Sequence, residues 1–412
     1  MSLRTDCDYI VKESISHVLP DATVKRALSE IKLKGGRLVL VSVGKAAWSM
    51  ARAAFDVLGD RIDDGIVITK YGYSQGKIGK LTVCEAAHPI PDENSFAATE
   101  KALEITRDLS EHDTVIFLLS GGGSALFELP LIDPAELMSI TNELLACGAD
   151  IVEINTIRKR LSGVKGGRFA KHCEPAQIFS VVLSDIIGDP LDMIASGPAC
   201  EDKSTCLDAL GIIEKYGLHI PNEAMRHINT ETPKCITNVT NRITGSVREL
   251  CTAAADACRK LGYEPKIITD TLNCEAKDAG LWLASTASEN AGSKKPLAFI
   301  AGGETVVHLT GSGKGGRNQE LALSAARGIA GLENTAVFSF GSDGTDGPTD
   351  AAGGFVTGDT VRILSEKGID IDAVLRENNS YTALSVCGGL IITGATGTNV
   401  NDAAVVLMGG KV

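Results

Sequence analysis

Short apolar runs alternate with longer amphipathic segments along the first half of the chain. Residues 37–44, 114–123 and 177–185 are three runs in which most positions are apolar until glycine or polar residues end them. Runs of this kind are typical of parallel strands that are buried on both faces. Helical spacing of apolar residues follows at 45–58 and 134–148. The alternation predicts an α/β fold with a doubly wound sheet and helices on both of its faces.

A change of pattern near the middle of the chain indicates a second domain. The stretch 229–235 is polar and contains a proline, and we place the domain boundary there. A second α/β series follows, with a long helix expected over 247–260 and a strand over 305–310. We therefore predict an N-terminal Rossmann-like α/β domain over residues 1–232 and a C-terminal α/β domain over residues 233–412.

The composition narrows the class of protein. The chain has 412 residues, a formal net charge of −12 and 11 cysteines without a Cys-x-x-Cys pair. An acidic surface does not attract phosphate backbones or anionic lipids, so we expect neither a nucleic-acid-binding nor a membrane-binding protein. The polar start MSLRTDCDY lacks the apolar core of a signal peptide, and no apolar run is long enough to span a bilayer. Scattered free thiols then predict a cytoplasmic protein.

Glycine-rich loops that contain polar residues follow several of the expected strands. In open α/β sheets, ligands bind where such loops gather, outside the carboxyl ends of the strands. The segment SGGGSA, Ser120–Ala125, offers backbone N–H groups to a phosphate or a carboxylate, although a tight turn without a ligand uses the same glycines. Lys45 directly follows the first buried strand, at a helix start where a cation is unfavourable unless an anion lies nearby.

Two further sets of charged residues suggest contacts to an anionic substrate and to a metal ion. The segment 158–168 holds five cations in 11 residues, which fits either the wall of an anion pocket or a solvated helix face. The loops 184–198 and 341–350 each hold three aspartates on glycine and proline turns. Such carboxylates bind Mg²⁺ together with substrate phosphates or accept a hydroxyl proton, but Asp-Gly turns are also common without a ligand.

The loop HLTGSGKGGRNQEL, His308–Leu321, contains the literal dinucleotide pattern G-x-G-x-x-G and a Gly-Lys pair. Four polar residues, 317–320, follow the glycines in place of the small apolar residues that pack a Rossmann helix. The Gly-Lys pair is followed by glycine rather than Ser or Thr, so the pattern of a Walker phosphate loop is not met either. We expect a flexible loop that brings Lys314 and Arg317 to an anion.

Nine short motifs, taken in order along the chain, resemble a known family. They are GKAA, SGGGSAL, N-x-x-R-K-x-L-S-x-x-K-G-G, SD-x-x-GD, ASGP, GGE-T-V, GKGGRNQE, DGTDGPTDAAG and TGTNVND. Together they resemble the glycerate 2-kinase family, also called class II glycerate kinase, with its C-terminal MOFRL domain. The resemblance covers nearly the whole chain and departs from the family pattern at Ala395, where a proline is expected.

The resemblance implies ATP- and Mg²⁺-dependent phosphorylation of D-glycerate to 2-phosphoglycerate, with the active site in a cleft between two α/β domains. It implies catalytic roles for Lys45 and Arg317, and we expect Asp189 to accept the hydroxyl proton. The expected metal ligands are Asp185, Asp343 and Asp346. The residues expected to bind glycerate or ATP are Ser120, Gly121, Gly122, Gly123, Ser124, Arg158, Lys165, Ser196, Gly197, Glu304, Lys314, Asn318, Glu320, Asn399 and Asn401.

Two alternative functions stay open at this point. Some members of the family carry the name hydroxypyruvate reductase, an NAD(P)H-dependent activity that an intact dinucleotide motif would support. A protein with the same fold could also bind a sugar acid without turnover. The expected partners are D-glycerate and ATP, without nucleic acid or membrane, and the sequence leaves a homodimer open.

Overall fold

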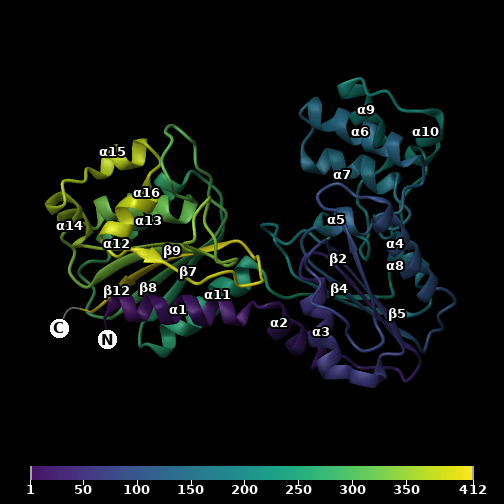
Figure 1. Ribbon diagram of the computed structural model, residues 1–412, viewed down its shortest axis with the longest axis horizontal. Coiled ribbons are helices and arrows are strands. Elements are labelled where there is room, and N and C mark those ends of the chain that lie inside the picture. Colours follow the sequence, from purple (N-terminus) through teal and green to yellow (C-terminus); the bar gives the residue numbers. More distant parts are fainter. Residues whose placement is uncertain (1, 411–412) are drawn as a thin grey trace. The chain divides into compact units, whose positions relative to one another are not determined.

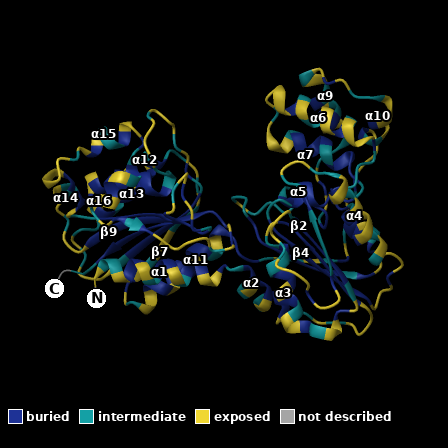
Figure 2. Ribbon diagram, viewed as in Figure 1, coloured by how far each residue is buried: buried dark blue, intermediate teal, exposed yellow. Residues whose placement is uncertain are grey.

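The computed structural model describes residues 2–410, which form two compact units. One comprises Pro20–Thr244 and is called the parallel-sheet unit; the other joins Met1–Leu19 to Gly245–Val412 and is called the mixed-sheet unit. Figure 1 shows the elements of both units, and each unit is described by itself. In Figure 2, buried residues run along the strands of both sheets, and exposed residues lie on the outer sides of the helices around them.

The parallel-sheet unit is built on six parallel strands in the order β3-β2-β1-β4-β5-β6. The strands are β1 (Leu38–Val43), β2 (Asp64–Lys70), β3 (Thr82–Ala86), β4 (Thr114–Leu119), β5 (Gln177–Val182) and β6 (Val239–Ile243). The chain leaves β1 toward one edge of the sheet and returns through β4 toward the other. This reversal creates a switch point between the carboxyl ends of β1 and β4, where open α/β sheets bind their ligands.

Helices cover both faces of this sheet, as the sequence predicts. The helices of the whole unit are α2 (Pro20–Leu28), α3 (Ala47–Leu58), η1 (Gly59–Arg61), α4 (Glu93–Ile105), α5 (Gly123–Leu126), α6 (Pro134–Ala146), α7 (Ile151–Arg160), α8 (Arg168–His172), η2 (Ile194–Ser196), α9 (Cys206–Tyr216) and α10 (Asn222–Ile228), of which α6, α7, α9 and α10 form a group of their own. Alternate residues of β1 enter two separate cores, with Val39 and Val41 in one and Leu38 and Leu40 in the other. The apolar run of β1 is continuous because both of its faces are buried.

Four helices of the parallel-sheet unit form a group with a small core of its own. Helices α6, α7, α9 and α10 lie together in Figure 1, and Leu144, Ile157, Ile212 and Ile228 belong to their shared apolar cluster. Helix α7 nevertheless contacts η2, on the loop that follows β5. The helical group thereby brings the side chains of α7 toward the carboxyl edge of the sheet.

The mixed-sheet unit contains a six-stranded sheet in the order β11-β10-β9-β12-β8-β7. Its elements are α1 (Leu3–His17), α11 (Val247–Lys260), β7 (Glu264–Leu272), α12 (Ala276–Glu289), β8 (Leu297–Gly303), α13 (Arg317–Gly328), β9 (Thr335–Gly341), β10 (Gly353–Thr357), α14 (Thr360–Glu366), α15 (Ile371–Arg376), α16 (Ser380–Val386), β11 (Leu390–Ile391) and β12 (Asp402–Met408). Strand β12 runs antiparallel between β9 and β8. The start of β12 therefore lies beside the carboxyl ends of both neighbours.

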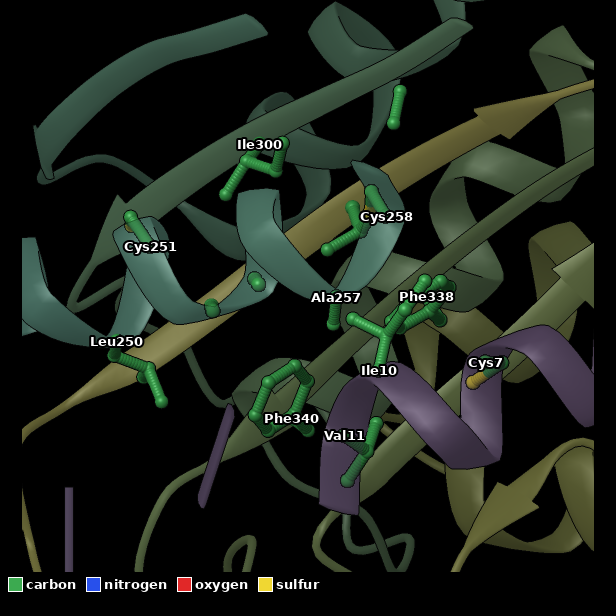
Figure 3. Packing of buried hydrophobic residues seen from close by; sticks show 14 of the residues in the cluster. Cys7, Ile10, Val11, Leu250, Cys251, Ala257, Cys258, Ile300, Phe338 and Phe340 are labelled. Carbon is green, nitrogen blue, oxygen red and sulfur yellow. The ribbon is translucent and has the colours of Figure 1, made fainter. Parts of the chain in front are cut away.

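The N-terminal helix belongs to the mixed-sheet unit, which differs from the prediction. Apolar residues of α1, among them Cys7 and Ile10, pack against α11 and against Phe338 of β9, as Figure 3 shows. The Tyr263 hydroxyl also donates a buried hydrogen bond of 2.7 Å to Asp6. The first residues of the chain therefore complete a core that is otherwise built from the C-terminal half.

The boundary between the units also differs from the predicted position at 232/233. Strand β6 lies after that position but pairs with β5, which keeps it in the parallel sheet, and the unit ends at Thr244. The polar stretch 229–235 follows α10 and is not a linker between the units. It is attached to the parallel-sheet unit, because Thr232 is buried and its hydroxyl donates to Asp202.

One expected strand is absent. Residues 305–310 form no strand. In the described part of the chain, no helix combines the length and apolar composition needed to cross a bilayer.

Candidate functional site

The loops after β1 and β4 begin side by side at the carboxyl edge of the parallel sheet. Val43 pairs with Leu119 in the sheet register, so the chain turns out of both strands at the same level. The Lys45 amide donates to the Gly121 carbonyl at 2.9 Å, and the Ser120 hydroxyl accepts from the Ala46 amide at 3.1 Å. These bonds hold Lys45, whose side chain is exposed, over the switch point of the sheet.

Glycines keep this edge open for neighbouring side chains. A Cβ atom at Gly121 would lie 2.3 Å from Oδ2 of Asp185, in the loop after β5. At Gly122, where φ is +89°, a Cβ atom would lie 3.0 Å from the ring of His88 and 3.3 Å from Cγ of Lys45. Groups from the ends of β1, β3, β4 and β5 therefore converge. We call Lys45, His88, Ser120–Gly123 and Asp185 the switch-point site.

A chain of polar contacts joins this site to helix α7. The Ser124 hydroxyl lies 3.2 Å from the Ser196 hydroxyl, and Ser196 in turn donates to Oδ1 of Asn155 at 2.9 Å. Nη2 of Arg158 donates to the Ser124 carbonyl at 3.2 Å. The predicted residues Ser124, Arg158 and Ser196 are therefore brought together, next to the glycines of the switch-point site, and Gly197 follows Ser196 directly.

Asp189 lies in the same loop as Asp185 and has two unusual features. Its φ of +53° is in the left-handed region, which is unfavourable for a residue with a side chain. Its Oδ1 is buried without a hydrogen-bond partner among the described residues. A buried oxygen of this kind can accept a hydrogen bond from a ligand, so Asp189 stays a candidate site residue.

The cations of segment 158–168 are largely paired inside the protein. Lys165 is fully buried and lies 2.6 Å from the equally buried Glu128, which Arg158 also approaches to 3.5 Å. Burial lowers the pKa of Lys165 to about 8. Lys159 and Arg160 both pair with the buried Asp202. Lys165 was predicted to bind the substrate, but in the structure it is buried and contacts Glu128 instead.

In the mixed-sheet unit, Arg317 lies at the start of α13 between two carboxylates. Its Nε and Nη2 donate to the two oxygens of Asp402 at 2.5 and 3.1 Å, and its Nη1 donates to Glu304 at 2.7 Å. Burial lowers the pKa of Arg317, but the hydrogen bonds and charges of Asp402 and Glu304 outweigh it and hold that pKa above its ordinary value. We call Glu304, Arg317 and Asp402 the arginine site.

The sheet register explains why these three residues meet. Asp402 opens β12 and pairs with Gly303, the last residue of β8, and with Gly341, the last residue of β9. Glu304 follows Gly303 directly. Side chains from two strand ends and one helix start therefore share this edge of the mixed sheet. The Asp402 side chain is 9% exposed and that of Glu304 is 45% exposed, so one partner of Arg317 is fixed and the other faces solvent.

Asp346 caps the helix that carries Arg317. Its carboxylate accepts the backbone amides of Asn318 and Gln319 at 3.1 and 2.9 Å, and the Gln319 side chain at 2.9 Å. Burial raises its pKa to about 6, although these hydrogen bonds oppose the rise. The structure therefore gives Asp346 a capping role in place of the predicted role as a metal ligand, because its oxygens accept hydrogen bonds from the first turn of α13.

The glycines of the loop 308–316 have a structural explanation. Gly311 and Gly313 approach the backbone of Glu377, where a Cβ atom would lie within 2.4 Å of it. The amides of Thr310 and Gly311 donate to the side chain of Asn378. The loop thus packs against the connection between α15 and α16. These contacts fix the conformation of the loop, whereas the sequence predicts a flexible one.

Two predicted ligand-binding residues take part in holding this loop. Glu320 is buried and accepts from the side chain of Asn378 at 3.0 Å, and burial raises its pKa. Nζ of Lys314 lies 4.0 Å from the centre of the Tyr381 ring. Glu320 is therefore not exposed to a ligand, whereas Lys314 lies at the surface of the loop.

Comparisons with known proteins agree with this architecture. Residues 6–229 match a domain of unknown function, DUF4147, and residues 297–402 match the MOFRL family. D-glycerate 2-kinase of Thermotoga maritima is 51% identical over 97% of this chain and 97% of its own. The chain belongs to the glycerate kinase family. The resemblance inferred from the nine motifs is confirmed.

Two further comparisons within and around the glycerate kinase family are informative. The crystal structure of glycerate kinase from T. maritima matches with a TM-score of 0.94 and 50% identity, covering 98% of this chain and 99% of that chain. A protein named putative hydroxypyruvate reductase, from Agrobacterium vitis, is 38% identical over 91% of this chain and 88% of its own. Both units therefore have the fold of the glycerate kinases. The activities given in the names of the relatives nevertheless differ.

The predicted metal ligands of this family member are divided between the two units. Asp185 lies in the parallel-sheet unit, whereas Asp343 and Asp346 lie in the mixed-sheet unit. Oδ1 of Asp343 accepts the amide of Thr345 within its own turn at 2.9 Å. Across residues 2–410, no three His, Cys, Asp or Glu side chains are arranged to hold a metal ion.

The remaining predicted residues lie at the arginine-site edge. Asn401 directly precedes Asp402, has a φ of +65°, and its carbonyl accepts from the Ser342 amide. Asn399 accepts the Asn401 amide with its side chain. Asn318 is buried in the first turn of α13. Asn399 and Asn401 shape the turn into β12.

Sequence reasoning missed His88, Asp402 and Glu128. Asp402 ends the motif TGTNVND, so a search of that motif for an arginine partner would have found it. His88 follows β3, and its proximity to Gly122 depends on the strand order, which the sequence does not show. Glu128 pairs with a lysine 37 positions away, for which no local pattern exists.

Proposed function

We propose that the protein transfers the γ-phosphoryl group of ATP to D-glycerate, giving 2-phosphoglycerate and ADP. The observation that carries the proposal is the 51% identity to D-glycerate 2-kinase over nearly the whole of both chains. The switch-point site and the arginine site supply the cations and carboxylates that such a transfer uses. Phosphoryl transfer depends on positioning and on charge stabilisation more than on covalent chemistry by the protein.

Lys45 and Arg317 are the proposed stabilisers of charge on the transferred phosphoryl group. Lys45 stands at the switch point with an exposed side chain, and Arg317 keeps N–H groups that Asp402 and Glu304 do not use. Glu304 is the solvent-facing partner, so a phosphate oxygen can replace it on Nη1. That both residues act on the same phosphoryl group, as the resemblance implies, stays a prediction that kinetics can test.

Asp189 is the proposed acceptor of the hydroxyl proton of glycerate. Its buried, unpartnered Oδ1 is free to accept a hydrogen bond, which distinguishes it from the capping Asp346. Asp185, beside Gly121, fits a Mg²⁺ ion held by one carboxylate and by substrate phosphates, which is how Mg²⁺ commonly binds. Bound there, the ion would neutralise phosphate charge.

The carboxylate of glycerate is proposed to bind near Ser124, Ser196 and Arg158. Arg158 takes the role for which the sequence also offered Lys165, because Arg158 is partly accessible and Lys165 is not. A guanidinium group matches the planar carboxylate with two parallel hydrogen bonds. Glu128 lies 3.5 Å from Arg158 but pairs more closely with Lys165, at 2.6 Å.

Hydroxypyruvate reduction is the second candidate, and two observations favour it. One is the name of the A. vitis relative, and the other is the strand order of the parallel sheet, which dinucleotide-binding domains share. Against it, β1 is followed by Gly44-Lys45-Ala46-Ala47 rather than G-x-G-x-x-G. The literal motif at 311–316 packs against Glu377 instead. If the protein only bound a sugar acid without turnover, the unfavourable backbone conformation of Asp189 would have no catalytic explanation.

A pair of assays on the purified chain separates these candidates. We expect ADP release that requires D-glycerate and is abolished when EDTA removes divalent cations. We expect no oxidation of NADH or NADPH on addition of hydroxypyruvate. Reductase activity without glycerate-dependent ADP release would replace the proposal by the second candidate, and glycerate binding without either activity would support the non-catalytic one.

Location and assembly are proposals as well. All 11 cysteines are free in the structure, which favours a reducing compartment such as the cytoplasm. Cell fractionation tests this location. A homodimer is the assembly we propose to look for, by light scattering coupled to size-exclusion chromatography.

A further inference from the structure

His88 is part of the switch-point site, but the roles proposed above do not use it. It follows β3, the edge strand of the parallel sheet, and β2 and β1 separate β3 from β4. Neighbouring strands lie about 4.8 Å apart, so β3 and β4 are roughly 14 Å apart. The ring of His88 nevertheless lies beside Gly122, in the loop after β4. The chain after β3 therefore carries this imidazole across the carboxyl edge of the sheet.

The ring lies where a ligand at the switch point would meet it. Cδ2 and Nε2 are 3.0 and 3.2 Å from the position that a Cβ atom would take at Gly122, and Cγ of Lys45 is 3.3 Å from the same position. A side chain at residue 122 would fill this space, and glycine leaves it open. The imidazole is half-buried, and among the described residues neither of its nitrogens has a hydrogen-bond partner.

The charge state of His88 suits a hydroxy acid better than a triphosphate. Burial, together with the positive charges of Lys45 and Lys70, lowers the pKa of His88. Near pH 7 its imidazole is therefore neutral, with one N–H donor and one acceptor nitrogen. A triphosphate is complemented by cations, whereas a donor paired with an acceptor complements a hydroxyl group next to a carboxylate.

We infer that His88 is a substrate-binding residue whose imidazole hydrogen-bonds the hydroxy acid in the switch-point site. The identity of that hydroxy acid, D-glycerate, rests on the proposed function. Lys45 supplies charge for the phosphoryl group in the same site, and His88 fixes the acceptor molecule beside it. The alternative is a purely structural role, in which the ring only fills the space above Gly122. In that case, a substitute that keeps the hydrogen-bonding groups but not the ring would not restore glycerate binding.

The test compares His88→Ala with His88→Gln, whose amide reaches the position of Nε2 and both donates and accepts. For His88→Ala we expect KM for D-glycerate to rise about tenfold, the effect of one neutral hydrogen bond, with KM for ATP unchanged. His88→Gln should recover most of the affinity. Ile90→Ala, an exposed position in the same segment, is the matched control and should behave as wild type. Thermal melting of each variant confirms that it folds.

Calorimetric titration with D-glycerate, without nucleotide, separates this inference from the proposed function. Weaker binding in His88→Ala than in wild type supports the inference even if the wild type shows no turnover, in which case the proposed kinase activity alone fails. A rise in KM for ATP instead of glycerate, equal losses in the Gln and Ala variants, or no glycerate binding by the wild type would each overturn it.

Discussion

At the residue scale, the chemistry of this family member depends on which charged groups stay accessible. Lys165 and Glu128 neutralise each other in the interior, whereas Arg158 of the same cation-rich segment stays partly exposed. Arg317 is ion-paired as well, yet one of its two carboxylates is buried and the other faces solvent. The number of charges in a motif therefore says less about function than their partners do.

Asp402 is predicted to position Arg317 through its two hydrogen bonds. Asp402→Asn keeps the shape but removes the charge, so we expect kcat to fall about tenfold or more, since charge-assisted bidentate contacts fix the guanidinium. Glu304→Gln is the matched comparison on the same arginine and should cost less, because Glu304 is solvent-facing. Steady-state kinetics with both substrates measures the difference, and equal losses in kcat would contradict distinct roles for the two carboxylates.

At the element scale, the sequence predicted the long, continuously apolar or strongly periodic elements well. Strands β1, β4 and β5 and helix α11 lie where their patterns place them. The segment 305–310 has the pattern of a strand but is irregular, because the Val306 amide donates to the Cys274 carbonyl and the Thr310 amide to the Asn378 side chain. The G-x-G-x-x-G of the following loop is explained by close packing against Glu377, which no local pattern reveals.

The cap of α13 gives this unit a pH-dependent stability. The pKa of Asp346 is raised to about 6, so between about pH 4 and 6 the folded state binds more protons than the unfolded state. The stability that this group contributes is present at low pH and is lost as the pH rises through 6. The difference in unfolding free energy between wild type and Asp346→Asn should fall by about 2–3 kcal/mol from pH 4 to pH 7.

Denaturant titrations at several pH values measure this difference. Asp350→Asn is the control of opposite sign, because the hydrogen bond from Tyr381 lowers the pKa of Asp350 and its contribution is lost as the pH falls. A difference for Asp346→Asn that grows with pH would contradict the assignment of a raised pKa.

At the scale of the whole molecule, the sequence predicted two α/β domains but misplaced what joins them. The N-terminal helix belongs to the mixed-sheet unit because its apolar face, including Cys7 and Ile10, completes that core. Such a long-range association leaves no trace in local periodicity. The candidate residues were found as motifs, but their grouping follows from strand order and register, which is why His88 was missed.

The two units are predicted to serve one reaction. Lys45→Ala and Arg317→Ala should each lower kcat by about 10²-fold or more, as expected for groups that stabilise transition-state charge. If both act on the same step as a unit, the double variant should be little worse than the poorer single variant. Lys101→Ala, an exposed lysine on α4, is the control. Losses that multiply fully would indicate that the two residues act independently.

The most direct test of the central claim is ³¹P NMR of the purified protein with ATP, Mg²⁺ and D-glycerate. The account predicts that the signals of ADP and 2-phosphoglycerate grow together and that neither grows without D-glycerate. A 3-phosphoglycerate signal would keep the kinase but contradict the position of transfer. The absence of any phosphorylated glycerate would contradict the account as a whole.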